Sequence, residues 1–326
     1  MQRREFVGLV GGAVAWPLAA GAQQPATPVV GFLYSDSADT AVQQVAWVLG
    51  GLATAGYVEG QSVRIEYRWA NNQYERLPGL AADLVQRRVV AIIVFGAVNA
   101  AIAAKEATKD IPIVFLVGSD PVQIGLVASL NRPGGNVTGV TLFNTELLAK
   151  RLELLRELVP NAATIGLLVN PNNPNTEPNV KELQALAQAG GWLAHVVAAR
   201  DELELDAAFA ALKQRHADGF LWGTDQFLTS RADRIAALAA QHAIPGISSN
   251  REFVEAGGLI CYGASRVDGY RQVGVYAGRI LKGEKPADLP VMQPTKFETV
   301  INLKAARALG LDVQTATLLR ADEVIQ

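Results

Sequence analysis

The sequence predicts an α/β protein built from two doubly wound lobes, each with a parallel sheet. Short runs rich in Val and Ile alternate with stretches of helical periodicity, and this rhythm occurs twice along the chain. The runs are continuously apolar, as is typical of parallel strands that helices cover on both faces. The chain has 326 residues, of which 50% are hydrophobic, whereas a single core stops growing at roughly 250 to 300 residues. Two lobes are therefore expected.

The first series alternates strands and helices from residue 28 onward. Its first helix ends near Gly56, because glycine readily takes the left-handed conformation that closes a helix. A short helix is expected after Pro121. The other elements are strands at residues 28–34, 62–70, 89–95 and 111–117, and helices at residues 41–57, 76–88 and 97–109.

A second series with the same rhythm follows a glycine-rich break. The break at residues 132–146 contains three glycines and one proline, as a crossover between lobes would. It is not predicted to bind phosphate, because neither G-x-x-x-x-G-K-[ST] nor G-x-G-x-x-G occurs in the mature chain. Residues 294–311 are expected to form a short strand and a helix that pack back on a lobe. The other elements are strands at residues 164–170, 192–199, 218–223 and 244–248, and helices at residues 178–189, 203–214 and 228–241.

Residues 1–22 have the three-part order of a secretory signal peptide. A basic start is followed by an apolar stretch and then by small residues before Gln23. Cleavage after Ala22 and export are therefore predicted, by the Sec or the twin-arginine route. A membrane anchor is the alternative, but glycines and a proline interrupt the stretch, which is shorter than the ~20 apolar residues of a span.

The composition indicates a small ligand and gives no sign of metal binding or catalysis. The net charge is -2 and no basic run of five residues occurs, so neither nucleic acid nor an acidic membrane surface is expected as partner. His195, His216 and His242 lack metal-ligand spacing, and G-x-S-x-G does not occur. No catalytic residue, cofactor or metal is predicted. Cys261 is the only cysteine, so it forms no internal disulfide and is expected in the core.

Polar residues at the ends of the predicted strands are the candidate ligand-binding residues, because ligands of open parallel sheets bind at the carboxyl ends of strands. At residues 95–99 a strand passes through Gly96 into a helix, whose free N–H groups and positive end suit a carboxylate. Asp120 follows the next strand and suits an ammonium group. Together they describe a holder for a zwitterion such as an α-amino acid. The residues that follow predicted strands also include Asn170, Asn173, Thr224, Ser248 and Ser249. The candidates are Ser35, Gly96, Ala97, Ser119, Asp120, Asn172 and Asp225.

Other interpretations of these residues stay open. Asp120 before Pro121 is also typical of a capping turn, and Asp225 of a helix N-cap. The asparagines of residues 170–175 fit a plain turn between two prolines. An α/β enzyme with Asp120 as its base is a further alternative, although no second acid or base accompanies this residue. Four aromatic residues either line the binding site of an aromatic ligand or pack in the core. They are Trp69, Trp222, Phe227 and Tyr262.

Five dispersed blocks, in the same order, give the chain a family resemblance over nearly its whole length. They are GYVEGQSVRIEYRWANNQYERLPGLAADLV, IPIVFLVGSDPVQIGLVASLNRPGGNVTGVTLF, KRLELLRELVP, REFVEAGGLICYG and RILKGEKPADLPVMQPTKFETVINLKAARALGL. In these segments the chain resembles the ABC-transporter substrate-binding proteins of the group that includes tryptophan- and other aromatic amino-acid-binding members. The resemblance implies the type I fold of periplasmic binding proteins, closure of two lobes on a small solute, and delivery of that solute to a membrane permease.

The resemblance also implies which residues bind the solute. The strand-end turn of the family falls on Gly96 and Ala97, its Asp-Pro-Val acid on Asp120, and its later strand-end acid on Asp225. The turn here is GAVNA, where the family often has a hydroxyl residue followed by proline, so backbone N–H groups are left to bind a carboxylate. Asp120 would pair with the cationic group of the solute. Further contacts with the solute, from both sides of the cleft, would come from Asp225, Tyr262 and Ser35.

The implied lobes are each made of two separate segments. Residues 28–143 with about 264–290 are expected to form lobe 1, and residues 144–263 with about 291–326 to form lobe 2. The hinge is expected near residues 142–146 and 262–268. The resemblance further implies a periplasmic monomer that contacts its permease transiently. A sensor that hands its ligand to a receptor is the alternative to transport.

Overall fold

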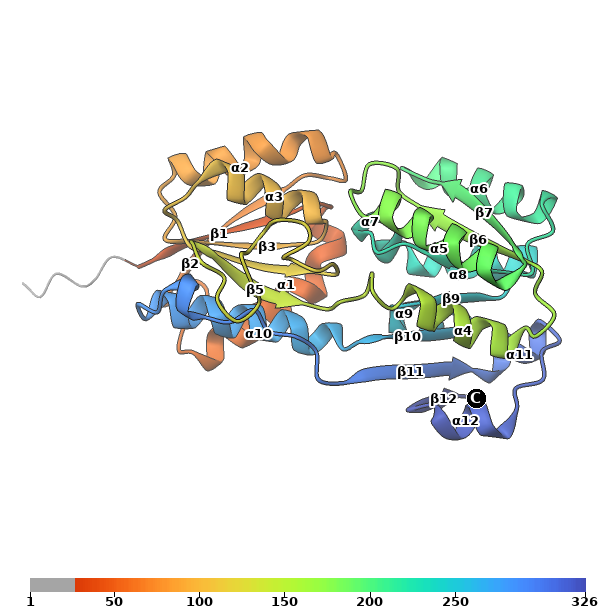
Figure 1. Cartoon of the computed structure of the whole chain (residues 1–326). Coiled ribbons are helices and arrows are strands. Elements are labelled where there is room, and N and C mark those ends of the chain that lie inside the picture. The colour runs from red at the N-terminus through yellow and green to blue at the C-terminus, as the bar shows by residue number, and fades with distance from the viewer. Residues whose placement is uncertain (1–26) are drawn as a thin grey trace, which may run out of the picture.

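The computed structural model describes residues 27–326, which form two α/β lobes side by side (Figure 1). The predicted signal peptide, residues 1–22, lies outside the described residues. Within residues 27–326, no helix is both long and apolar enough to span a bilayer.

Lobe 1 is a five-stranded parallel sheet with helices on both faces. Its strand order is β2-β1-β3-β4-β5. Helices α1 and α10 pack on one face, and α2 and α3 pack on the other. The strands are β1 (Val29–Tyr34), β2 (Arg64–Trp69), β3 (Ala91–Phe95), β4 (Ile113–Val117) and β5 (Val137–Thr141). The helices are α1 (Ala38–Thr54), η1 (Tyr74–Arg76), α2 (Leu77–Gln86), α3 (Val98–Ala107), α10 (Arg266–Leu281) and η2 (Pro286–Asp288).

Lobe 2 repeats this topology and extends it by two strands. The order β7-β6-β8-β9-β10 matches that of lobe 1, and β11 and β12 continue the sheet beyond β10. The pair β10 and β11 is antiparallel, whereas the other pairs are parallel. The strands are β6 (Thr164–Val169), β7 (Leu193–Ala198), β8 (Gly219–Trp222), β9 (Gly246–Ser248), β10 (Ile260–Ala264), β11 (Phe297–Asn302) and β12 (Glu323–Ile325).

Helices cover both faces of the second sheet as well. One core cluster joins residues of α6, α8 and α9, and the other joins residues of α4, α5 and α11. The helices are α4 (Leu148–Leu158), α5 (Thr176–Gly190), α6 (Glu202–Gln214), α7 (Gln226–Ser230), α8 (Ala232–His242), α9 (Arg251–Glu255), α11 (Leu303–Ala308) and α12 (Thr315–Arg320). Cys261 is buried in this lobe, and burial raises the pKa of its thiol to about 12. The predicted doubly wound α/β fold is confirmed.

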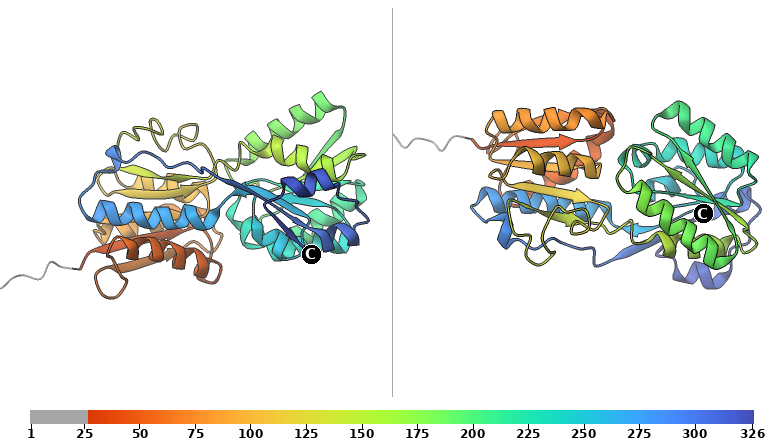
Figure 2. Two further views of the ribbon diagram at one scale, coloured as in Figure 1. Left: turned by 90° about the horizontal axis from the view of Figure 1, so that it is seen from below. Right: turned by 45° about the horizontal axis from the view of Figure 1, so that its top comes forward.

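The chain passes between the lobes three times (Figure 2). It crosses from β5 to α4, from β10 to α10, and from η2 to β11. The first two passages fall at the predicted hinge segments, 142–146 and 262–268. The third passage, between Leu289 and Phe297, was not among them. Hinge bending itself stays a prediction.

Three local elements differ from the sequence-based expectations. Residues 137–141 form β5, although they lie in the stretch predicted as a break. The short helix predicted after Pro121 is wrong, because the chain forms a turn there that ends at Gly125, with a φ of 71°. The single helix predicted at residues 228–241 is divided into α7 and α8 at Arg231.

Glycines bring α1 and α10 unusually close together. A Cβ added at Gly51 would lie 2.0 Å from the carbonyl oxygen of Arg271, and one added at Gly274 would lie 2.0 Å from that of Val48. Relief of such a clash requires a shift of the helix backbone, and not only of a side chain. Gly51→Ala is therefore expected to lower the free energy of unfolding by about 1 to 3 kcal/mol.

Gly50→Ala is the matched control, since its added Cβ meets nothing within 4 Å and alanine favours helix over glycine. Urea denaturation of both variants measures the difference. Equal stability of the two variants would show that the helices do not approach as closely as described.

Candidate ligand-binding site

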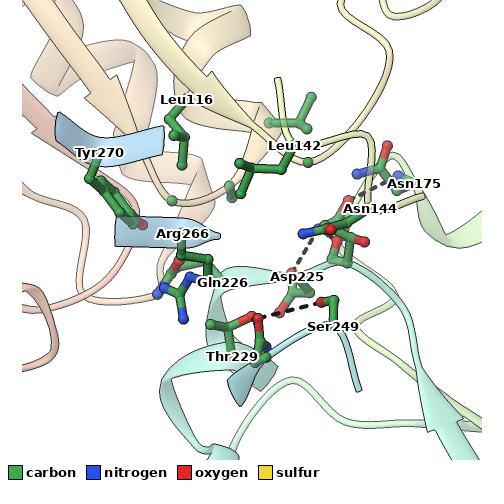
Figure 3. Close-up of a pocket in the computed structure, with 17 residues that line it drawn as sticks. Leu116, Leu142, Asn144, Asn175, Asp225, Gln226, Thr229, Ser249, Arg266 and Tyr270 are labelled. Carbon is green, nitrogen blue, oxygen red and sulfur yellow. Dashed lines mark hydrogen bonds between the residues drawn. The ribbon is translucent and has the colours of Figure 1, made fainter. Parts of the chain in front are cut away.

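A cavity lies between the lobes where the carboxyl ends of both sheets face each other (Figure 3). In each sheet the strand order reverses direction beside the first strand, β1 or β6, and ligands of doubly wound folds bind at this switch point. The volume of the cavity is about 40 Å³, and it is about 480 Å³ when the adjoining open space is counted. It is lined by Gly96, Ala97, Val98, Leu116, Gly118, Leu142, Asn144, Asn173, Asn175, Thr224, Asp225, Gln226, Thr229, Ser249, Asn250, Arg266 and Tyr270.

The two sides of the cavity differ in polarity (Figure 3). Leu116, Leu142 and Tyr270 form an apolar surface on the lobe 1 side, next to the side chain of Arg266. The lobe 2 side presents amide, hydroxyl and carboxylate groups, among them Asp225 and Asn175. Such a cavity suits a solute with an apolar body and a polar end.

The first turn of α3 borders the cavity and can bind an anionic group. Gly96 has a φ of 99°, and the N–H of Ala97 donates to Oγ of Ser35 at 2.8 Å. These contacts fix the start of α3, where the first N–H groups have no acceptor within the helix. The positive end of the helix dipole therefore faces the cavity, as a carboxylate requires.

Asp225 is the carboxylate that lines this cavity, and it is 4% exposed. Its Oδ1 accepts from the N–H of Leu228 at 3.1 Å, so it is the N-cap of α7. Its Oδ2 accepts from Nδ2 of Asn173 at 2.8 Å and from the hydroxyl of Tyr74, in lobe 1, at 3.0 Å. Burial raises the pKa of Asp225, although these hydrogen bonds act in the opposite direction. The capping interpretation is thus borne out, and the residue also faces the cavity.

Three buried polar atoms of the cavity wall have no hydrogen-bond partner within the described residues. They are Oδ1 of Asn144, Nδ2 of Asn175 and Oγ1 of Thr224. Buried polar groups are nearly always paired in folded proteins, so these atoms indicate where polar groups of a solute would bind. An acceptor, a donor and a hydroxyl together match a zwitterion better than a purely apolar molecule.

The lobes also touch each other directly around the cavity. Nε2 of Gln226 donates to the hydroxyl of Tyr34 at 2.6 Å. Oδ2 of Asp36, which is 2% exposed, accepts from Oγ of Ser230 at 2.6 Å and pairs with Arg231 at 3.1 Å. These contacts join lobe 1 to lobe 2 and close the cleft.

We expect Asp36→Asn to weaken ligand binding about fivefold to tenfold, although Asp36 does not line the cavity. Loss of the charged pair with Arg231 destabilises the closed form relative to the open form by roughly 1 kcal/mol. Binding weakens because the ligand binds the closed form. Asp39→Asn is the control, since Asp39 is exposed in the first turn of α1. Calorimetry gives Kd, and small-angle scattering of the free protein gives the radius of gyration. An unchanged Kd and radius would refute this role of Asp36.

The sequence-predicted residues occupy three different places. Gly96, Ala97 and Asp225 line the cavity. Oγ of Ser35 accepts from the N–H of Ala97 in the turn before α3. The carbonyl of Asn172, in lobe 2, accepts from Nδ2 of Asn99, in lobe 1, at 3.2 Å. The other three lie elsewhere: Tyr262 stacks on Phe297, with ring centroids 6.0 Å apart, and Ser119 and Asp120 line a neighbouring cavity.

Asp120 acts as a turn cap in this structure. Its Oδ1 accepts from the N–H of Val122 at 2.8 Å and of Gln123 at 3.4 Å. Its own N–H donates to Oε1 of Glu146 at 3.1 Å. The expectation that Asp120 and Gly96 would share one cavity therefore does not hold, although their two cavities have Asn175 in common.

Several lining residues were absent from the predicted set. Asn173, Thr224 and Ser249 were recognised at strand ends in the sequence but were not among the chosen candidates. Arg266 and Tyr270 come from α10, which has no such signal. The aromatic residues Trp222 and Phe227 are core residues, as one interpretation expected.

Two doubly wound lobes that enclose a cavity and are joined by three passages define the class of bilobal solute-binding proteins. Residues 27–325 match the family model described as ABC transporter substrate binding protein, so the chain belongs to that family. The resemblance found in the sequence is confirmed. Because the family consists of solute-binding proteins, the chain is a substrate-binding protein with the type I fold and not an enzyme.

Two proteins whose descriptions name an amino acid are similar to most of the chain. A tyrosine-binding protein of Clostridioides difficile (strain R20291) is 30% identical over 279 residues, which are 83% of this chain and 79% of that protein. A solved ABC domain from Streptococcus pneumonia in complex with L-Trp is 27% identical, with a TM-score of 0.81 over 92% of this chain and 100% of that one.

An open relative is less similar in shape. The ligand-free, open structure of a substrate-binding protein with adhesive properties from Clostridium difficile is 26% identical and has a TM-score of 0.64, over 92% of this chain and 99% of that chain. The L-Trp complex has nearly the same identity but a higher TM-score.

Proposed function

We propose that this protein is the exported solute-binding component of an ABC importer and that it binds an amino acid with an apolar, aromatic side chain. The observation that carries the proposal is a cavity between the lobes that combines a helix start, a buried carboxylate and apolar side chains. The relatives that bind tyrosine and L-Trp support the same class of ligand.

Each part of the zwitterion has a partner in this proposal. The first turn of α3 takes the carboxylate, and Asp225 with Oδ1 of Asn144 takes the ammonium group. The side chain packs against Leu116, Leu142 and Tyr270. Asp225 replaces Asp120 as the proposed ammonium partner, because Asp120 does not line this cavity.

Transport needs motion of the lobes and a membrane partner. We propose that residues 28–143 with about 264–290 form lobe 1, that residues 144–263 with about 291–326 form lobe 2, and that the three passages act as the hinge. The ligand stabilises the closed form because only that form brings both lobes into contact with it. The proposed site of action is the periplasm, after cleavage at Ala22, with a monomer that meets its permease transiently.

A thermal-shift panel on the chain from Gln23 onward tests the ligand class. A ligand at 100 times its Kd stabilises the folded state by roughly 2.7 kcal/mol, which raises Tm visibly. L-tryptophan, L-tyrosine and L-phenylalanine are expected to raise Tm, whereas their N-acetyl and methyl ester derivatives, which lack one charge, are not. A larger shift with sugars or with dicarboxylic acids than with any amino acid would contradict the proposal.

A further inference from the structure

Arg266 is the one positively charged side chain among the described residues that line the candidate ligand cavity, and Asp225 is the one negatively charged side chain. Arg266 is the first residue of α10, directly after the second passage between the lobes. Its side chain is 9% exposed and lies next to Tyr270 and Gln226 (Figure 3). In the proposed function Asp225 has a partner in the ligand, whereas Arg266 has none.

Arg266 has more hydrogen-bond donors than its ion pair uses. Its Nη1 donates to Oε1 of Glu252, in α9 of lobe 2, at 2.9 Å. Glu252 is 40% exposed and lines two outer cavities but not the ligand cavity, so it approaches Arg266 from the outer side. A guanidinium has five N–H donors, and buried donors are nearly always paired. An acceptor in the ligand cavity would therefore find donors on Arg266.

The guanidinium of Arg266 keeps its charge at this place. Burial lowers the pKa of Arg266, but the carboxylate of Glu252 and the hydroxyls of Tyr270 and Tyr34 raise it above its ordinary value. Cζ of Arg266 also lies 5.8 Å from the centroid of the Tyr270 ring, a distance at which an aromatic ring attracts a cation. The cavity wall thus contains a fixed positive charge that an anionic group of a ligand can approach.

Arg266 and the start of α3 lie at the same end of the cavity. Tyr270, which contacts the guanidinium, packs against Phe95, with ring centroids 5.7 Å apart. Phe95 directly precedes Gly96 in the turn before α3. Asp225 lies apart from Arg266 and Tyr270, on the other side of the cavity (Figure 3). The cavity therefore has a positive end formed by lobe 1 and a negative end formed by lobe 2.

We propose that Arg266 binds the α-carboxylate of the amino acid together with the first N–H groups of α3, and that it makes the protein specific for solutes with a carboxylate. A helix start supplies only a partial positive charge, whereas a guanidinium carries a full charge and pairs with both oxygens of a carboxylate. This inference rests on the proposed function, because it concerns the same ligand in the same cavity.

The ion pair with Glu252 is a second role of Arg266, because it joins lobe 1 to lobe 2. Loss of this pair acts on closure of the lobes and would weaken the binding of every ligand by the same factor. Loss of a carboxylate contact weakens only those ligands that have a carboxylate. The preference for an amino acid over its α-amide, which has nearly the same shape but no negative charge, therefore separates the two roles.

Calorimetric titration of the chain from Gln23 onward measures this preference with L-tryptophan, L-tyrosine and their α-amides. At about pH 6 the α-amino groups of all four ligands are protonated, so each acid differs from its amide in the carboxylate alone. The unaltered protein is expected to bind the tighter of the two amino acids at least about 30-fold better than its amide.

Arg266→Met is expected to reduce this preference at least about tenfold, because the carboxylate loses a charged partner and the amide does not. Arg271→Met removes the same charge at an exposed position of α10 outside the cavity and is expected to leave the preference unchanged. Glu252→Gln breaks the charged pair with Arg266 and is expected to weaken acid and amide alike, without reducing the preference. Arg266→Gln takes the place of Arg266→Met if the latter does not fold.

A preference in Arg266→Met within about twofold of that of the unaltered protein would overturn the role of Arg266 and leave the proposed function standing. A loss confined to L-tyrosine and equal for its acid and amide would also overturn it, because Arg266 would then contact the side chain of the ligand. If no amino acid binds to the unaltered protein, the proposed function and this inference both fail.

Discussion

Asp225→Asn is expected to raise the Kd for the cognate amino acid at least about 30-fold, which corresponds to roughly 2 kcal/mol. The ammonium group of the ligand would lose its only charged partner in the cavity wall, since Asp225 is the one carboxylate among the described lining residues. The variant keeps the size of the side chain, so the cavity keeps its shape. Calorimetry with the amino acid that gives the largest thermal shift measures the change.

Two controls separate binding from folding in this experiment. Asp225 also caps α7, so the Tm of the variant without ligand shows how much stability the cap contributes. Asp233→Asn changes the same charge at an exposed position in the first turn of α8 and is expected to leave Kd unchanged. If Asp120→Asn costs 30-fold and Asp225→Asn costs less than threefold, the sequence-based assignment is right and the assignment from the cavity is wrong.

Gly96→Ala is expected to weaken binding by about 100-fold. The φ of 99° at this residue is a conformation that side chains rarely adopt, and an added Cβ would lie 2.3 Å from Oγ of Ser35. Relief of this clash moves the N–H groups at the start of α3, which hold the carboxylate in our proposal. A displacement of about 1 Å at such a site suffices to lose most of its hydrogen bonding.

Gly60→Ala is the matched control for backbone strain. Gly60 has a φ of 76°, but its Cβ would meet nothing within 4 Å, and the residue is exposed outside the cavity. Both variants are expected to lose stability through strain, and only Gly96→Ala is expected to lose binding. Equal Kd values for the two would show that the start of α3 does not contact the ligand.

The strand-end rule located much of the site from the sequence. Gly96, Ala97 and Asp225 follow strands beside the two switch points, and strand ends can be recognised from apolar runs alone. The rule did not give side-chain direction. Gly118 lines the candidate ligand cavity, whereas Ser119 and Asp120, only one and two residues further along, line the neighbouring cavity.

Residues supplied by the passages could not be found in this way. Arg266 and Tyr270 reach the cavity because α10 returns to lobe 1 and packs on α1, a long-range arrangement that no local pattern encodes. Leu142 and Asn144 belong to the first passage and depend on the path of the chain between the lobes.

The missed strand β5 has a local cause. Gly139 lies in its centre, where a Cβ would lie 2.2 Å from the carbonyl oxygen of Phe115 in β4. The close approach of the two strands requires glycine, and glycine in a sequence is typical of loops. The turn after Pro121 was expected to be helical because a capping aspartate such as Asp120 is typical both of turns and of helix starts.

A crystal structure of the chain with the amino acid that gives the largest thermal shift would show which residues hold each group of the ligand. We predict the carboxylate of the ligand at the first N–H groups of α3, its ammonium group on Asp225, and its side chain against Leu142 and Tyr270. A ligand whose ammonium group lies on Asp120 in the neighbouring cavity, with the cavity beside Gly96 empty, would contradict this prediction.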